Sequence, residues 1–262
     1  MKPQIFIFSR GRAKNVITLK SLNKTMRACT KLVVYQEEQE EYQRAHPDIE
    51  VIVANGPKLA RRRQEIYQKY SGKMIFLDDD LSFLELSILD DKIHRTEMDT
   101  HSVNQMINEV HLKLDQYSAV TLNTLTAPPS IQSIQQEFEE NSRMTQFLAY
   151  NKDLINFPLD FTKVLDAEDF YATLQLLTHG LKNYKFTKYA ICSSGSQTKG
   201  GCSIYRTNQT HNESMLILKE LYPDFVKLRE VSGFNKEGIR LKATIYWKKA
   251  FNSFKKQNCI KF

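Results

Sequence analysis

Short apolar runs alternate with longer amphipathic segments along the first eighty residues of this chain. Runs of strand length occupy residues 5–8, 31–35, 50–54 and 73–77. The polar segments between them are long enough to form helices, and this alternation is typical of βαβ units. The pattern therefore predicts an α/β fold, with a mainly parallel central sheet flanked by helices.

Three segments repeat apolar residues at the three- and four-residue spacing of a helix. These predicted helices span residues 59–70, 102–117 and 166–180. Pro57 precedes the first as a start signal. The third has Asp166 as an N-cap and Gly180 at its end. Returning strands are expected at residues 119–122 and 186–192.

The composition is that of a folded globular protein without a membrane segment. A chain of 262 residues with 41% hydrophobic residues can bury a sizeable core. The four cysteines are scattered and form no CxxC pair, which indicates reduced thiols. We find neither a signal peptide nor an apolar stretch of about 18 residues, and we expect a cytoplasmic protein with no membrane contact.

The charge balance points towards an anionic partner without defining one. Lysine and arginine outnumber aspartate and glutamate by 37 to 30, a formal net charge of +7. Such an excess favours a polyanion such as nucleic acid, but it is equally consistent with a solvated surface. Charge alone therefore leaves a nucleic-acid partner open.

Polar residues follow three of the predicted strands at the point where each strand ends. The first strand runs into Ser9, Arg10, Gly11 and Arg12, the third into Asn55, and the fourth into Asp78, Asp79 and Asp80. Ligands of parallel sheets bind beyond the carboxyl ends of the strands. We therefore expect these residues to converge at one edge of the sheet.

Three consecutive carboxylates after an apolar strand repel one another unless solvent, hydrogen bonds or a cation offset the repulsion. Mg²⁺ or Mn²⁺ binds one or two carboxylates and completes its shell with water and phosphate oxygens. In extended backbone Asp78 and Asp80 point the same way and Asp79 points opposite. This favours Asp80 as a metal ligand and Asp78 as a ligand of the metal or nucleoside. The alternative is a simple acidic turn or helix cap.

Two groups of arginines could contact phosphate. Gly11 permits close backbone approach and the arginines beside it offer bidentate donors, so residues 9–12 suit a nucleotide. The run of Arg61, Arg62 and Arg63 at a helix start could likewise face a diphosphate, although at least two of such a trio are more often solvated.

A second acidic cluster begins the helix predicted at residues 166–180. Glu168 and Asp169 lie in its first turn, where the helix dipole stabilises negative charge, so capping alone explains them. The functional alternative is that one of them removes the proton of an acceptor hydroxyl.

The Gly- and Ser-rich segment 193–201 is typical of a mobile active-site loop, or equally of an ordinary surface loop. Lys199, Gly200, Gly201 and Arg206 are the candidates there for holding an acceptor.

Taken together, these motifs resemble GT-A glycosyltransferases. The resemblance lies in residues 8–12 (FSRGR), 59–64 (LARRRQ), 76–80 (FLDDD) and 167–169 (AED), in that order. More narrowly, residues 7–12, the Asp triplet and residues 200–206 (GGCSIYR) resemble the phage TET-associated glycosyltransferases, over roughly residues 4–235.

The resemblance implies a nucleotide-sugar-binding half at residues 1–125. An acceptor-binding half with a basic C-terminal extension follows at residues 126–262, within one compact domain. It implies Mn²⁺ or Mg²⁺ held by Asp80, Asp78 and His211, a UDP-sugar donor, and Asp169 or Glu168 as acceptor-side base in inverting members. The donor site would comprise Ser9, Arg10, Gly11, Arg12, Asn55, Arg63, Asp78 and Asp79.

The implied reaction is transfer of glucose or N-acetylglucosamine to 5-hydroxymethylcytosine in phage DNA, in the host cytoplasm. Basic residues between 242 and 261, among them Lys248 and Lys249, would then contact DNA phosphates. Three alternatives remain at this stage: a glycan- or protein-modifying transferase, a sugar nucleotidyltransferase or metal-dependent phosphoesterase, and a non-catalytic nucleic-acid-binding module.

Overall fold

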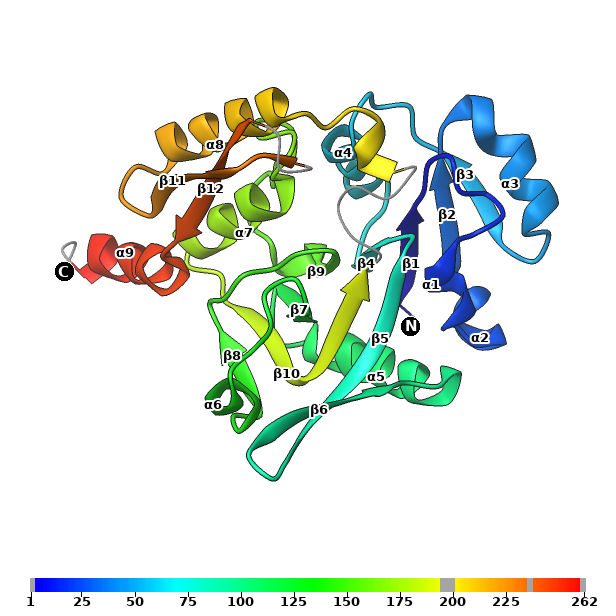
Figure 1. The fold of residues 1–262 in the computed structure, drawn as a ribbon, viewed down its shortest axis with the longest axis horizontal. Helices are drawn as coiled ribbons and strands as arrows, with labels where there is room; N and C mark the ends of the chain where they lie inside the picture. Colours follow the sequence, from blue (N-terminus) through cyan, green and yellow to red (C-terminus); the bar gives the residue numbers. More distant parts are fainter. Residues whose placement is uncertain (1–2, 194–200, 235–237, 260–262) are drawn as a thin grey trace.

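The computed structural model describes residues 3–193, 201–234 and 238–259. A ten-stranded sheet crosses the molecule in the order β3-β2-β1-β4-β9-β7-β10-β5-β6, with β8 paired to β10 (Figure 1). A separate two-stranded sheet, β11-β12, lies near the C-terminus. This is the expected α/β architecture with a C-terminal extension.

The N-terminal strands confirm the predicted parallel sheet. They are β1 (Gln4–Phe8), β2 (Thr30–Val34), β3 (Glu50–Val53) and β4 (Lys73–Asp78), and their mutual pairings are parallel. The connecting helices are α1 (Ile17–Lys20), α2 (Lys24–Arg27), η1 (Gln36–Glu38), α3 (Gln39–Ala45) and α4 (Leu59–Lys69). Alternate residues of β1 enter different cores: Ile5 and Ile7 one, Phe6 and Phe8 the other. Such strands are buried on both faces, which is why they read as continuous apolar runs.

The remainder of the large sheet mixes directions. Its strands are β5 (Leu81–Leu89), β6 (Lys92–Glu97), β7 (Ala119–Thr124), β8 (Phe138–Glu140), β9 (Phe147–Asn151) and β10 (Asn183–Ser193). β9 lies antiparallel between β4 and β7, and β5 and β6 form an antiparallel extension on β10. Periodicity predicted β7 and β10 but not the antiparallel strands. The sheet runs continuously across the boundary expected near residue 125.

The predicted helices in this region form with shifted ends. They are α5 (Thr100–Lys113), α6 (Ile131–Ile134), η2 (Lys152–Leu154) and α7 (Glu168–Thr178). Asp99 begins α5 earlier than predicted, because its side chain accepts a 2.7 Å hydrogen bond from the amide of Ser102. The prediction that Asp166 caps α7 is wrong. Ala167 occupies that position without a side-chain cap, and the Asp166 carboxylate lies 3.3 Å from the Lys58 ammonium.

A helix–hairpin unit follows, comprising η3 (Gly201–Ile204), α8 (Asn208–Leu221), β11 (Val226–Ser232), β12 (Ile239–Ile245) and α9 (Trp247–Cys259). Figure 1 shows it packed beside α7. A separate apolar cluster joins them, including Leu174 and Leu177 of α7, Met215 and Leu218 of α8, and Phe251 of α9. α9 is a regular helix with aromatic residues on its packed face, which the sequence pattern did not predict.

Candidate active site

A cleft opens at the carboxyl ends of β1 and β4, as expected for a parallel sheet. Its volume is about 430 Å³, within the range of small-molecule sites. The start of α7 and residues of α8 and β12 complete its wall. Of the predicted site residues, the cleft brings together Ser9, Arg10, Arg12, Arg63, Asp78, Asp79, Asp80, Glu168, Asp169, Gly201, Arg206 and His211.

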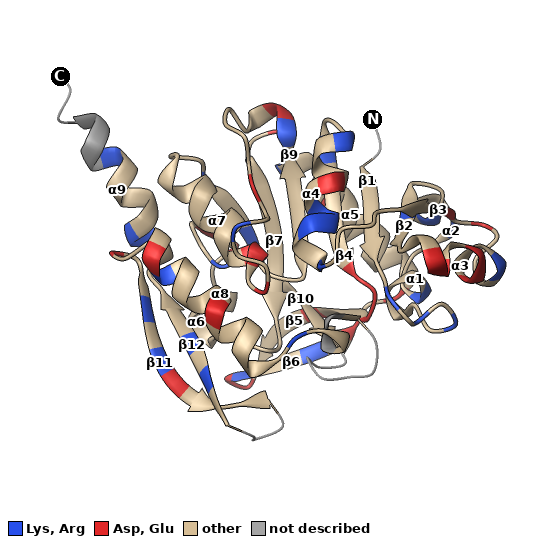
Figure 2. Ribbon diagram, turned by 90° about the horizontal axis from the view of Figure 1, so that it is seen from above, with Lys and Arg blue, Asp and Glu red and all other residues tan. Residues whose placement is uncertain are grey.

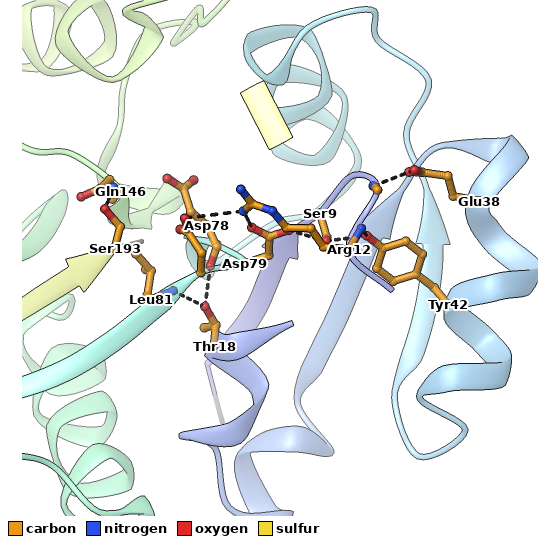
Figure 3. A network of polar contacts seen from close by, with 12 residues as sticks. Ser9, Arg12, Thr18, Glu38, Tyr42, Asp78, Asp79, Leu81, Gln146 and Ser193 are labelled. Atoms are coloured by element: carbon orange, nitrogen blue, oxygen red, sulfur yellow. Dashed lines mark hydrogen bonds and ion pairs between the residues drawn. The ribbon is translucent and has the colours of Figure 1, made fainter. Parts of the chain in front are cut away.

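Asp79 is the most deeply held member of the acidic triplet. Its carboxylate accepts hydrogen bonds of 2.5 Å from the Ser9 hydroxyl and 2.6 Å from the Arg12 guanidinium. The Ser9 hydroxyl also lies 2.6 Å from the Tyr42 hydroxyl (Figure 3). Burial raises the pKa of Asp79, while Ser9 and Arg12 oppose that shift. Asp79 and Ser9 thus belong to a buried hydrogen-bond network, which fixes the strand end.

Gly11 allows the β1 loop to turn back into this network. Its backbone has φ 65°, and its amide donates a 2.7 Å hydrogen bond to the Glu38 carboxylate. Next to it, the Arg10 guanidinium lies 4.5 Å from the centre of the Tyr35 ring, while the Arg62 guanidinium lies 4.3 Å from the same ring. Cation–π contacts of this kind hold Arg10 at the cleft wall.

Arg63 joins the two acidic clusters. Its guanidinium lies 2.8 Å from the Asp78 carboxylate and 2.7 Å from the Glu168 carboxylate, and its side chain is only 2% exposed. Burial raises the pKa of Asp78 to about 6, and Arg63 opposes that shift. Burial likewise raises the pKa of Glu168. Arg63 was expected to face the donor diphosphate, whereas here both terminal nitrogens of its guanidinium contact carboxylates.

The cleft-lining carboxylates suited to a cation are those of Asp78 and Asp80. The Asp78 side chain is 27% exposed, uses Oδ1 for Arg63 and lines the cleft. The Asp80 carboxylate lies 3.5 Å from Arg12, and its side chain is 12% exposed. One or two carboxylates beside a phosphate-bearing ligand are the donor set that Mg²⁺ and Mn²⁺ prefer. The residues present therefore fit such an ion.

His211, on α8, has one hydrogen-bonded ring nitrogen and one without a hydrogen-bond partner in the described part of the chain. Its Nε2 lies 2.9 Å from the Leu241 carbonyl oxygen, which can only accept, so Nε2 carries the proton. Nδ1 is buried without a hydrogen-bond partner in the described part of the chain. Burial lowers the pKa of His211, which favours the neutral ring. Across the described ranges, no three His, Cys, Asp or Glu side chains are arranged to hold a metal together, so ligation by His211 stays a prediction.

Asp169 and Glu168 occupy different surroundings despite being adjacent. Glu168 is 4% exposed and held by Arg63, whereas Asp169 is half-buried at the cleft. Asp169 Oδ1 accepts a 2.8 Å hydrogen bond from the Phe170 amide. Arg143 also lines the cleft, with its guanidinium 4.9 Å from the Phe170 ring. Asp169 is consequently the better placed of the two to meet an acceptor hydroxyl.

The remaining predicted residues differ in their relation to the cleft. Asn55 is exposed and does not line the cleft. Its side chain instead accepts a 3.2 Å hydrogen bond from the Gln36 amide. The amide of Gly201 donates to the Arg10 carbonyl at 3.0 Å, which places it against the β1 loop rather than on a separate acceptor wall. Arg206 lines the cleft. Lys199 and Gly200 lie outside the described residues.

Sequence reasoning missed several residues that shape the site. Tyr42 anchors the Asp79 network, Tyr35 contacts two arginines, and Arg143 supplies a cation near Asp169. Tyr42 and Tyr35 belong to ordinary amphipathic stretches and carry no motif. Arg143 had one usable signal, since it is a lone cation in the predominantly uncharged run 141–151.

The fold and the acidic strand end together define a GT-A-type glycosyltransferase. A solved structure with a similar fold is a mannosyltransferase from Pyrobaculum calidifontis, determined in complex with GDP-Man and Mn²⁺. The TM-score is 0.54 at 12% identity, covering 86% of this chain and 65% of that one. This chain thus spans less than two thirds of that protein, and the likeness concerns the fold.

The chain belongs to the TET-Associated Glycosyltransferase family, which matches residues 3–201. Two curated relatives are named Beta-glucosyl-HMC-alpha-glucosyl-transferase. The protein of Enterobacteria phage T6 is 27% identical over 206 residues, covering 74% of this chain and 72% of the relative. The protein of Enterobacteria phage T2 is 26% identical over 250 residues, covering 87% and 88%. The expected family is confirmed.

None of the helices in the described ranges has the length and hydrophobicity needed to cross a lipid bilayer.

The Arg63 bridge predicts a specific pattern of stability changes. Arg63→Met should lower the free energy of unfolding by about 3–5 kcal/mol, because it leaves buried carboxylates without their cation. Adding Glu168→Gln to Arg63→Met should restore part of that loss, since the uncompensated charge is removed. Urea denaturation measures each value. The control Arg61→Met, at an exposed position of the same helix, should change stability by no more than about 0.5 kcal/mol. Strictly additive losses in the double variant would contradict a direct bridge.

Proposed function

We propose that this glycosyltransferase moves a hexose from a UDP-sugar to a hydroxyl carried by hydroxymethylcytosine in DNA. The observation that carries the proposal is the Arg63 bridge, which sets the acidic end of β4 beside the acidic start of α7 in one cleft. These are the two halves that a transfer reaction needs, one for the donor diphosphate and one for the acceptor. The names of the two phage relatives support the acceptor class.

On the donor side, the charges are arranged for a diphosphate. Asp80 and Asp78 would hold Mn²⁺ or Mg²⁺, as the one or two carboxylates that such an ion takes beside a diphosphate. The bound ion supplies positive charge that stabilises the departing diphosphate. Arg10, at the cleft wall beside Tyr35, is placed to contact the nucleotide. Asp79 and Ser9 hold the strand end in position rather than contacting the donor.

On the acceptor side, we assign the proton transfer to Asp169. Its half-buried carboxylate lines the cleft, where the Arg143 guanidinium is an electrostatic neighbour. A base must reach the acceptor hydroxyl by hydrogen bond in the bound complex. Glu168 acts as a positioning residue, because Arg63 holds its carboxylate and it is nearly excluded from solvent.

The acceptor hydroxyl belongs either to the base itself or to a sugar already attached to it. Both phage relatives are named for adding glucose to β-glucosyl-HMC, which favours glucose as the transferred sugar.

A target inside duplex DNA has to leave the base stack to reach the cleft. Membership of a glycosyltransferase family disfavours the nucleotidyltransferase and the non-catalytic binding module.

Asp80→Ala should abolish transfer while leaving the fold intact, because it removes a metal ligand at the cleft and no core side chain. Sugar transfer is measured with Mn²⁺ present, and folding by thermal unfolding. Asp153→Ala, which removes an exposed carboxylate elsewhere, is the matched control and should transfer normally. Full activity of Asp80→Ala, or activity that a chelator leaves untouched, would sink the metal assignment.

Asp169→Asn should slow transfer by about a hundredfold or more while donor affinity changes little, because an amide cannot accept the hydroxyl proton. Single-turnover rates and UDP affinity separate the two effects. Glu168→Gln is the matched control and should affect stability more than rate. The anomeric configuration of the product is a second readout. Retention of the donor configuration requires no base opposite the leaving group and would remove this role from Asp169.

The acceptor is tested with a matched panel of DNA duplexes containing cytosine, hydroxymethylcytosine or β-glucosyl-hydroxymethylcytosine. The protein, Mn²⁺ and UDP-glucose are incubated with each duplex, and the nucleosides are analysed by mass spectrometry. We expect a mass increase of one hexose with a hydroxylated duplex and none with cytosine. Equal transfer to free sugars or glycans and to hydroxylated DNA would instead support the glycan-modifying alternative.

A further inference from the structure

The net charge of this protein is confined to its C-terminal region. Residues 202–262 contain twelve lysines and arginines against five acidic residues, whereas residues 1–201 contain 25 of each. The whole excess of +7 therefore lies beyond the segment that matches the family. Figure 2 shows lysine and arginine along β11, β12 and α9.

The register of the β11–β12 hairpin sorts its side chains onto two faces. Val226, Leu228, Leu241, Ala243 and Ile245 share the face that packs against the cluster of α7, α8 and α9. The opposite face carries Lys227, Arg229 and Val231 from β11, and Arg240, Lys242 and Thr244 from β12. We call this the outer face of the hairpin. It has four cations and no carboxylate, since Glu230 lies on the other face.

These four cations have no neutralising partner in the described ranges. None of them forms an ion pair there, although Arg240 lies 4.6 Å from the Phe234 ring and Lys227 lies 5.4 Å from the Tyr246 ring. Arg229 and Lys242 are directly paired across the strands. Like charges in that arrangement destabilise a hairpin. Packing and stability thus give no reason for this face to be cationic.

The outer face is contiguous with the active site. Arg240 and Lys242 line the cleft, while Lys227 and Arg229 extend the cationic row away from it on β11. Lys249 of α9 is less suited to an anion, because its ammonium already donates to the Asp224 carbonyl at 2.9 Å.

We propose that the outer face of the hairpin binds the sugar-phosphate backbone of duplex DNA and presents the modified base to the cleft. The inference rests on the proposed function. Lys227 and Arg229 are two residues apart on one strand, a separation of about 6.8 Å. Phosphates recur about every 3.4 Å along the axis of each DNA strand, so they are dense enough for each of the two cations to contact its own phosphate. A two-stranded β-ribbon is also among the elements that dock on duplex DNA.

The test uses the double variant Lys227→Gln/Arg229→Gln, which spares the residues lining the cleft. Its matched control is Lys92→Gln/Arg95→Gln, which removes one exposed lysine and one exposed arginine from the edge strand β6. Affinity for a hydroxymethylated duplex is measured at several salt concentrations. The hairpin variant should flatten the slope of log affinity against log salt by about two units, one per cation. The control should keep the wild-type slope.

Two further readouts separate DNA binding from other effects. The KM for DNA should rise in the hairpin variant without a change in affinity for UDP. Its Tm should equal or exceed that of the wild type, since like-charge repulsion is relieved.

Each remaining outcome has a defined meaning. Wild-type transfer to DNA together with an unchanged salt slope in the hairpin variant would overturn the inference and leave the proposed function standing. Absence of any transfer to DNA by the wild type would overturn both. Tighter binding of an RNA duplex, lost in the same variant, would assign the face to RNA instead.

Discussion

A single buried cation holds the two acidic clusters of this protein together. The guanidinium of Arg63, on α4, bridges Asp78 at the end of β4 and Glu168 at the start of α7. Removing three charges from water is costly, and the cost is offset only when all of them lie in hydrogen-bonding geometry. The bridge thus fixes the relative positions of three elements that are distant in sequence. The shape of the cleft therefore depends on the two ion pairs of Arg63.

The three consecutive aspartates likewise have different hydrogen-bond and ion-pair partners. Asp79 is buried and accepts hydrogen bonds from Ser9 and Arg12, and these contacts hold the strand end in place. Asp78 shares one oxygen with Arg63 and lines the cleft. Asp80 remains at the cleft near Arg12. Three adjacent carboxylates can coexist because each has a different environment.

The chain also separates catalysis from electrostatic attraction. Residues 1–201, with 25 charges of each sign, contain the sheet, the acidic triplet and the acidic start of α7. The C-terminal unit carries the positive excess and packs on α7 through its own apolar cluster. A cationic surface that packs on α7 can hold a polyanion without disturbing the buried ion pairs of the cleft.

The sequence by itself determined the parallel strands β1 to β4, helix α4 and the position of the Asp triplet, because buried strands and amphipathic helices leave a local periodicity. It also indicated the family through motifs that follow those strands. Only the tertiary structure decided that β9 inserts antiparallel beside β4, that Asp166 meets Lys58, and that Tyr42 supports Asp79. Only the hairpin register placed four cations on one face. These features depend on contacts between residues far apart in the chain, and a local pattern of hydrophobic and polar residues does not encode which distant partner each side chain will meet.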